Sequence, residues 1–177
     1  MRKGFTLIEL LIVIGILAIL AAVVVLTLNP AQLLAQARDS QRISDLGSIK
    51  SAVSLYLATA TSTSISSTKT STNSTTCWFG SGCNTACTAV STSTAINGTG
   101  WVPIDLTQTS GGSPLSALPL DPTNDATYHY AYAGDATAKT IELNAILEST
   151  KYSPMMQSDG GNCANVYEVG TEPGLDL

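Results

Sequence analysis

Hydrophobic and polar positions follow three successive patterns along the 177-residue chain. Nearly every position from 5 to 28 is apolar, and about 24 such residues in a helix span roughly 36 Å, enough to cross the ~30 Å hydrocarbon core of a bilayer. Residues 31–58 carry apolar side chains at steps of three and four, which predicts an amphipathic helix. Beyond residue 100, short alternating stretches predict strands.

The amphipathic stretch has one apolar stripe, which we expect to pack against a sheet of the same chain. The stripe consists of Ile43, Leu46, Ile49, Val53 and Leu57. Pro30 lacks a backbone donor and disfavours helix at Asn29, so a kink is predicted there. Arg42 lies three residues from both Asp39 and Asp45, and we expect these charges to meet on the solvated side of the helix.

Residues 59–76 lose this periodicity and consist mainly of serine and threonine. Such a composition buries too little apolar surface to offset the entropy of ordering, so we expect a mobile, exposed loop. Glycan attachment to its hydroxyl groups is an alternative role. Asn73 and Asn97 lie in Asn-x-Ser/Thr sequons, which are a weak signal because they arise often by chance.

The alternating stretches predict a small sheet. Residues 128–134 place three tyrosines on one face, residues 140–148 alternate aliphatic side chains, and a Gly/Asp turn between them predicts a hairpin. Residues 165–171 are expected to add a third strand, and residues 153–163 to form a connecting loop. We interpret the tyrosines as cross-strand packing and His129, on the opposite face, as a surface or half-buried residue without a catalytic role.

Composition excludes several classes of function. The formal charge is −5, and the eight Lys and Arg residues are scattered, so no nucleic-acid surface is expected. Much of the 44% hydrophobic content lies in the N-terminal run, which leaves a modest core for the remainder. The chain carries no nucleophile elbow, zinc-protease motif or phosphate-binding glycine loop, and it has one histidine. We therefore predict a protein that is not an enzyme and needs no cofactor.

Four cysteines, Cys77, Cys83, Cys87 and Cys163, indicate an oxidising compartment and two disulfides. A zinc site is disfavoured because five residues separate the first two cysteines and no histidine lies nearby. Three connectivities are open. We favour one bond within the first three cysteines and one bond to Cys163, which would fasten the Ser/Thr-rich region to the C-terminal segment.

Charges beside the apolar run predict its orientation. Arg2 and Lys3 precede the run, while the first charges after it nearly cancel, so the positive-inside rule places the N-terminus in the cytoplasm and the remainder outside. A cleavable signal peptide and a plain membrane anchor are alternatives. The apolar run exceeds the ~7–15 residues that are typical of a signal peptide.

Glu9 is the one charged residue inside this run. A carboxylate in the hydrocarbon core costs roughly 2.5–3.5 kcal/mol and usually has a partner or a role. A cut between Gly4 and Phe5 would create an α-ammonium group at Phe5, about one helical turn from Glu9. An axially staggered neighbouring helix could present the same group with better geometry.

The segment KGFTLIELLIVIGILAILAAVV resembles the N-terminus of type IV prepilins and type II secretion pseudopilins. The resemblance implies that a membrane prepilin peptidase cleaves after Gly4 and methylates the new amine of Phe5. It also implies that Glu9 pairs with the Phe5 amine of an adjacent subunit in a helical homopolymer, assembled by an ATPase-driven platform in the inner membrane.

The predicted fold class is α+β, with a long N-terminal α-helical spine, membrane-spanning in its first half, packed on a small C-terminal antiparallel β-sheet head. The expected domains are a leader (1–4), a transmembrane and filament-core helix (5–30), an amphipathic helix (31–58), a Ser/Thr-rich and cysteine-containing loop (59–100) and a β-sheet head (101–177). We expect a subunit of a type IV pilus or a type II secretion pseudopilus. It would cross the inner membrane once, N-terminus inside and C-terminus outside, before joining an extracellular or periplasmic filament. The alternative is a single-pass anchored, exported binding protein that does not polymerise.

Residues 118–128, LPLDPTNDATY, resemble the loop before the sheet in major pseudopilins, and some of those heads hold calcium there. Asp121, Asn124 and Asp125 could supply oxygen ligands, but their spacing departs from the regular calcium loop. Turn formation by Asp and Asn beside proline accounts for the same residues, and it is the interpretation that we favour.

Overall fold

The computed structural model describes residues 4–80 and 82–177, so Met1 to Lys3 of the expected leader lie outside the described residues. The chain divides into two compact units, Met1–Ala35 and Gln36–Leu177.

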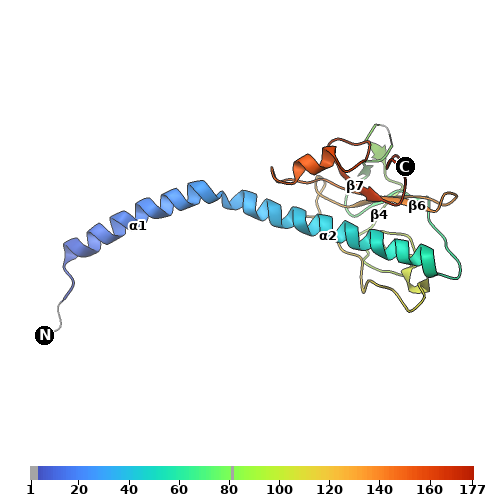
Figure 1. The fold of residues 1–177 in the computed structure, drawn as a ribbon, viewed down its shortest axis with the longest axis horizontal. Coiled ribbons are helices and arrows are strands. Elements are labelled where there is room, and N and C mark those ends of the chain that lie inside the picture. The colour runs from blue at the N-terminus through green and yellow to red at the C-terminus, as the bar shows by residue number, and fades with distance from the viewer. Residues whose placement is uncertain (1–3, 81) are drawn as a thin grey trace. The chain divides into compact units, whose positions relative to one another are not determined.

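The first unit contains the apolar helix α1, Leu7–Leu28, and the start of α2, Pro30–Thr59 (Figure 1). The 22 residues of α1 span about 33 Å at 1.5 Å per residue. Asn29 separates the two helices with a φ of 41°, in the left-handed region. This is where the interruption was expected, because the proline ring disfavours helical backbone at the preceding residue.

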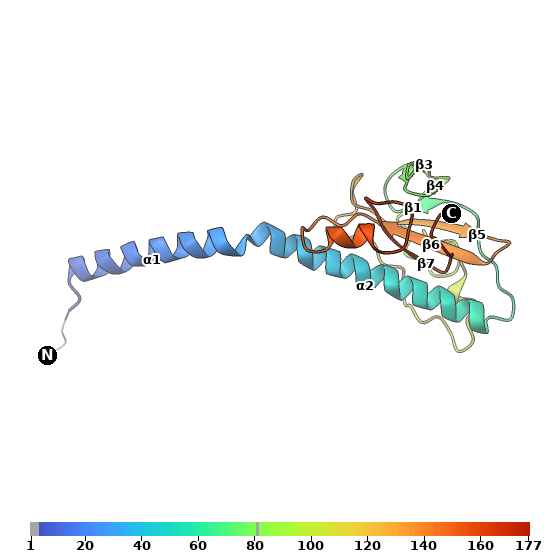
Figure 2. The same cartoon turned by 45° about the horizontal axis from the view of Figure 1, so that its top comes forward.

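The second unit begins with the rest of α2, which lies beside a β-sheet in both ribbon views (Figures 1 and 2). Leu46, Ile49 and Val53 of the expected stripe are buried. Ala52 and Tyr56 are also buried, whereas the ends of the expected stripe are only partly covered. The stripe therefore faces the sheet of the same chain.

The sheet has five strands in the order β4-β1-β5-β6-β7. Its strands are β1 (Thr70–Ser71), β4 (Ala89–Val90), β5 (Ala131–Asp135), β6 (Thr140–Ala145) and β7 (Tyr167–Gly170). The expected hairpin is β5–β6, with Tyr132 opposite Leu143, and the expected third strand is β7, antiparallel to β6. The expected α+β fold with a small antiparallel sheet is confirmed, and the sheet has one parallel pairing, between β1 and β4. A separate antiparallel pair joins β2 (Thr76–Cys77) to β3 (Thr85–Ala86).

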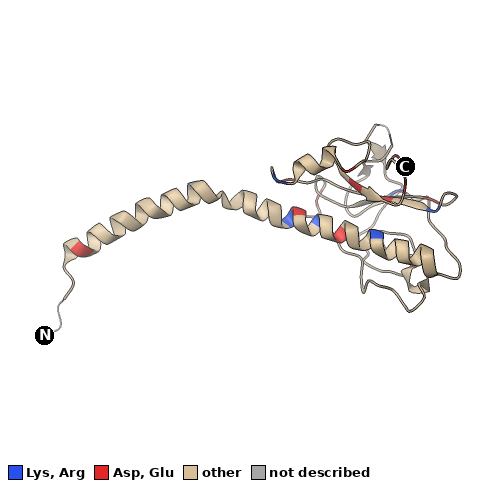
Figure 3. Cartoon of the chain, viewed as in Figure 1, with Lys and Arg blue, Asp and Glu red and all other residues tan. Residues whose placement is uncertain are grey.

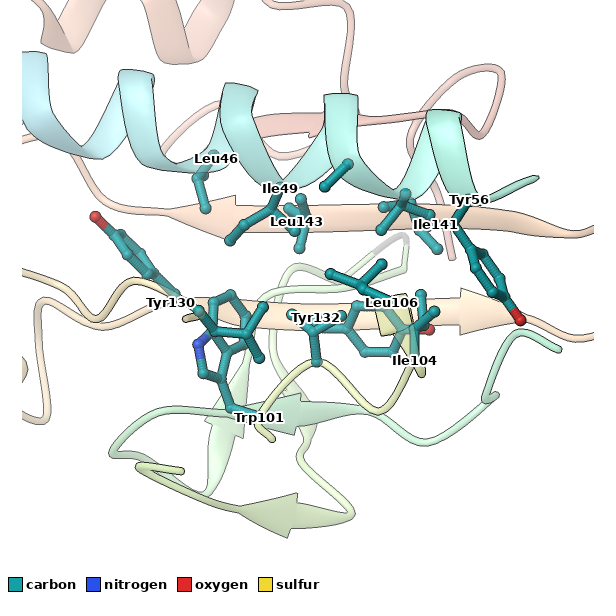
Figure 4. Packing of buried hydrophobic residues seen from close by; sticks show 14 of the residues in the cluster. Leu46, Ile49, Tyr56, Trp101, Ile104, Leu106, Tyr130, Tyr132, Ile141 and Leu143 are labelled. Atoms are coloured by element: carbon teal, nitrogen blue, oxygen red, sulfur yellow. The ribbon is translucent and has the colours of Figure 1, made fainter. Parts of the chain in front are cut away.

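Alternation along the strands produces two buried faces. On one face, Tyr130 and Tyr132 meet Ile141, Leu143 and the α2 stripe (Figure 4). Residues from the segment around the short 3₁₀ helix η1 (Leu106–Gln108) complete this core: Trp101, Ile104 and Leu106. The third expected tyrosine, Tyr128, is only partly buried and lies under a guanidinium group, 4.8 Å from its ring centroid.

The opposite face of the sheet is covered by the cysteine-containing segment. A second apolar cluster there consists of Cys77, Phe79, Ala131 and Ala133. Glu142, Asn144 and Glu168 are buried as well. Glu142 and Asn144 alternate with the core residues of β6, so they point away from α2.

The expectation of a mobile, exposed loop over residues 59–76 is wrong. Ile65 belongs to the main core, and Thr70 to Thr72 are buried. Thr70 and Ser71 form β1, which pairs with β5 on one side and with β4 on the other. Short hydroxyl side chains fit a strand between two neighbours, and the Thr70 hydroxyl donates to the backbone oxygen of Trp101.

The expectation that Asp39, Arg42 and Asp45 meet on the solvated side is also wrong. Asp39 and Arg42 are fully buried. Arg42 Nη1 donates to Asp39 Oδ1 at 2.8 Å, and Arg42 Nε donates to Asp121 Oδ2 at 2.6 Å. Asp45 instead accepts a hydrogen bond from the hydroxyl of a core tyrosine. The spacing of charges along α2 could not reveal the burial of Arg42, because the carboxylate that covers it, Asp121, comes from a distant loop.

His129 is fully buried, which corrects its expected placement at or near the surface. Its ring stacks on Trp78 with 4.2 Å between centroids, and its Nε2 lies 3.1 Å from the Thr76 oxygen. Burial lowers the pKa of this imidazole. The expected connecting loop over 153–163 also contains a short 3₁₀ helix, η2, Ser153–Gln157.

Candidate functional site: the N-terminal processing and anchoring segment

The expected cleavage point lies just before the first helix. Gly4 and Phe5 have no helical backbone, and Phe5 is 84% exposed. Thr6 is the N-cap residue of α1, with extended backbone angles. The Gly4–Phe5 peptide bond is therefore both exposed and free of helical hydrogen bonds, as a peptidase substrate must be.

Glu9 and Thr6 form a reciprocal capping box. Thr6 N and Thr6 Oγ1 donate to Glu9 Oε2 at 2.9 and 2.7 Å, and Glu9 N donates to Thr6 Oγ1 at 3.3 Å. The carboxylate thus has neutral donors within its own chain, a partner that was not predicted. The Thr-Leu-Ile-Glu pattern was the available signal, since Ser/Thr followed three residues later by Glu is typical of a capped helix start.

The helix dipole adds to this arrangement. A carboxylate in the first turn of a helix is stabilised by the partial positive charge of the N-terminal backbone amides. A new ammonium group at Phe5 would lie at the same end, where a cation is disfavoured.

The surface of α1 is apolar on all sides. Every residue of α1 whose side chain the structure describes is exposed, from Leu7 onward. The sequence of α1 contains one acidic residue, Glu9 in its first turn, and no basic residue. Figure 3 shows the acidic colour at the N-terminal end of this helix. By length and composition, the helical run that begins at Leu7 qualifies as a membrane span, and none of its most apolar stretch is buried. A helix that is hydrophobic all round requires lipid or other protein around it.

The four cysteines form two disulfides, Cys77–Cys87 and Cys83–Cys163. This is the favoured pattern of one bond within the first three cysteines and one to Cys163. The first bridge closes a segment next to β2 and β3, and the second links that segment to the chain before β7.

The three calcium candidates are engaged in turns and ion pairs. Asp121 accepts from the Arg42 guanidinium and from the backbone amides of Thr123 and Asn124. Asp125 Oδ1 accepts two backbone amides, which lower the pKa of this carboxyl. Among the residues that the structure describes, no group of three or more His, Cys, Asp or Glu side chains is placed to hold a metal. Calcium binding by these residues stays an untested expectation.

Comparison with known families agrees with the N-terminal geometry. The apolar helix α1 is capped by Thr6 and follows the exposed residues Gly4 and Phe5. Residues 1–25 match the family model described as the prokaryotic N-terminal methylation motif, the signature of type IV pilins and pseudopilins. No curated protein and no solved structure matches the chain.

Proposed function

We propose that this protein is a structural subunit of a type IV pilus or a type II secretion pseudopilus, and that it has no enzymatic activity. The observation that carries the proposal is the methylation motif over residues 1–25, which coincides with an apolar helix whose described side chains are exposed. The motif supports processing by a prepilin peptidase and anchoring by one pass through the inner membrane.

In the proposed processing step, the peptidase hydrolyses the Gly4–Phe5 bond and the new Phe5 amine is methylated. The leader is removed and α1 remains on the mature chain. With Arg2 and Lys3 on the cytoplasmic side, the second unit lies outside the membrane.

In the proposed assembly step, α1 leaves the bilayer and packs among the α1 helices of other subunits on the inner-membrane platform. The Glu9 carboxylate of one subunit then pairs with the Phe5 ammonium group of the next. The pair compensates a charge that is costly in lipid, while the exposed apolar surface of α1 is covered by sister helices. The product is a helical homopolymer in the periplasm or at the cell surface.

Two substitutions separate this charge pairing from helix capping. Glu9→Gln retains a side-chain oxygen for the capping box but removes the negative charge. Thr6→Ala removes the capping hydroxyl and keeps the carboxylate. We expect Glu9→Gln to be inserted into the membrane normally but to be absent from sheared filaments, and Thr6→Ala to enter filaments at close to the normal level.

Both variants are scored by immunoblot of the membrane and sheared-filament fractions from cells that also produce the wild-type subunit. Normal incorporation of Glu9→Gln would contradict the pairing role. Loss of both variants from filaments would show that the helix cap is required in addition to the charge. Stable insertion of wild-type protein without any filament would favour the anchored binding protein instead.

A further inference from the structure

A pair of buried carboxyl groups lies on the sheet face that points away from α2. Glu142 comes from β6 and Glu168 from β7, and Asn144 of β6 stands directly opposite Glu168 in the strand register. All three side chains are at most 2% exposed. Within the described residues, no ion pair joins either glutamate to a lysine or arginine.

Three of the four carboxylate oxygens of this pair accept an N–H group. Glu142 Oε1 accepts from Asn144 Nδ2 at 2.8 Å, and Glu142 Oε2 accepts from Leu177 N at 2.9 Å. Glu168 Oε2 accepts from Cys163 N at 2.7 Å. The fourth oxygen, Glu168 Oε1, is buried without a hydrogen-bond partner, as is Asn144 Oδ1. An unpaired buried carboxylate oxygen is costly, so this position calls for a hydrogen atom or a cation.

The surroundings favour a proton over a metal ion. The amide nitrogen of Asn144 donates to Glu142 and to the backbone oxygen of Trp78, so a donor already occupies the space between these oxygens. Gly161 packs directly on the Glu168 carboxyl group, and a Cβ at this position would collide with it. This close cover leaves little room for a hydrated cation but accommodates a proton.

We propose that Glu168 is the protonated member of this pair, with Oε1–H donating to the Glu142 carboxylate, and that the shared proton fastens the 158–163 loop and the C-terminal segment to the sheet. Loss of the proton at alkaline pH leaves two buried carboxylates that repel each other. Their separation releases both segments, because Glu168 holds Cys163 N and Glu142 holds Leu177 N.

The negative charges that face the pair favour its protonated form, and two lysines lie nearby with the opposite charge. Asp159, whose carboxylate accepts from Glu168 N, and Glu172 add negative charge, and Lys50 lines the same cavity of about 410 Å³ as Glu168. In the C-terminal segment, Leu177 O accepts a hydrogen bond from Lys69 Nζ. Burial, followed by the neighbouring carboxylates, raises the pKa of Glu168 to about 8, and burial also raises the pKa of Glu142.

The sign of the pH effect follows from this raised pKa. A carboxyl group that ionises later in the folded than in the unfolded state contributes stability at low pH that is lost as pH rises. Between about pH 4.5 and about pH 8, unfolding releases the proton of Glu168. The contribution of Glu168 alone therefore raises the unfolding equilibrium constant about tenfold per pH unit.

The test compares Glu168→Gln with Glu142→Gln in the full chain in detergent micelles. Glutamine at 168 can accept from Cys163 N and donate through Nε2 to Glu142, as the protonated acid does. Glutamine at 142 would place its amide nitrogen against Asn144 Nδ2 or Leu177 N, and each of these is already an N–H donor. We expect Glu168→Gln to flatten the fall in thermal midpoint from pH 5 to pH 9, and Glu142→Gln to lower the midpoint throughout that range. Glu172→Gln is the matched control and should keep the wild-type slope.

Hydrogen–deuterium exchange at pH 9 provides the local measurement. We expect faster exchange in residues 158–163 of wild-type protein than of Glu168→Gln. Carboxyl ¹³C NMR should show Glu168 titrating well above pH 4.5. The proposal would be overturned by normal titration near pH 4.5, by Glu142→Gln being the better tolerated variant, or by a thermal midpoint at pH 8 that rises with calcium in wild type but not in Glu168→Gln.

Discussion

At the residue scale, Arg42 connects α2 to two distant segments. Its guanidinium group binds Asp39 on the same helix, Asp121 in the loop before the sheet and Glu148 after β6. Removing one partner of a buried charge network leaves the others uncompensated. We expect Arg42→Met to reduce the free energy of unfolding by about 3–5 kcal/mol, measured by urea unfolding of the full chain in detergent.

Arg38→Met is the control for this prediction. Arg38 also pairs with Glu148, at 2.6 Å, but its side chain is 36% exposed. Because solvent screens such a pair, its loss should cost less than about 1 kcal/mol. Equal costs for the two substitutions would contradict a special role for the buried guanidinium.

Glu148 provides an acid-side prediction. Hydrogen bonds from Arg38 and then Arg42 lower the pKa of this carboxyl to about 2, against an ordinary value of 4.5. A lowered pKa contributes stability above pH 4.5 that is lost as pH falls toward 2. We expect the thermal midpoint of wild-type protein to fall across this interval more steeply than that of Glu148→Gln. Parallel curves for the two proteins would refute the assignment.

At the element scale, the two disulfides fasten segments over very different chain lengths. Cys77 and Cys87 are 10 residues apart, whereas Cys83 and Cys163 are 80 apart. Loop-closure entropy gives a stabilisation of a little under ~3 kcal/mol for the short loop and a little over ~4 kcal/mol for the long one. Replacing the second pair by alanine should therefore lower unfolding free energy more than replacing the first pair. The reverse order in urea unfolding would contradict this account.

The sequence predicted elements wherever the side-chain pattern repeats locally. The apolar run, the α2 stripe, the β5–β6 hairpin and β7 all follow from spacing alone, as does the interruption at Asn29. The spacing of Thr6 and Glu9 also matches a capping box.

Long-range pairing accounts for what the sequence did not reveal. β1 consists of Thr and Ser, and it becomes an ordered strand only because β5 and β4 lie on both sides of it. The sequence around Arg42 is typical of a surface position, and its burial depends on the carboxylate of Asp121 in a distant loop. The Glu142 and Glu168 pair depends on the β6–β7 register, which residue types alone do not specify.

At the scale of the whole molecule, the chain consists of an apolar N-terminal helix and a disulfide-linked head that has its own core. The described side chains of α1 are all exposed in the isolated chain, so we propose that lipid and then sister helices cover this apolar surface. The second unit carries its own core, buried charges and cross-links, and it requires no partner to cover the α2 stripe.

The most direct test of the central claim is tandem mass spectrometry of the N-terminal peptide from sheared and purified filaments. Our account predicts that the peptide begins at Phe5, carries one methyl group on the α-amine and derives from a chain that forms the body of the filament. A subunit that retains Met1 to Gly4 in the filament, or a processed chain that never leaves the membrane fraction, would contradict it.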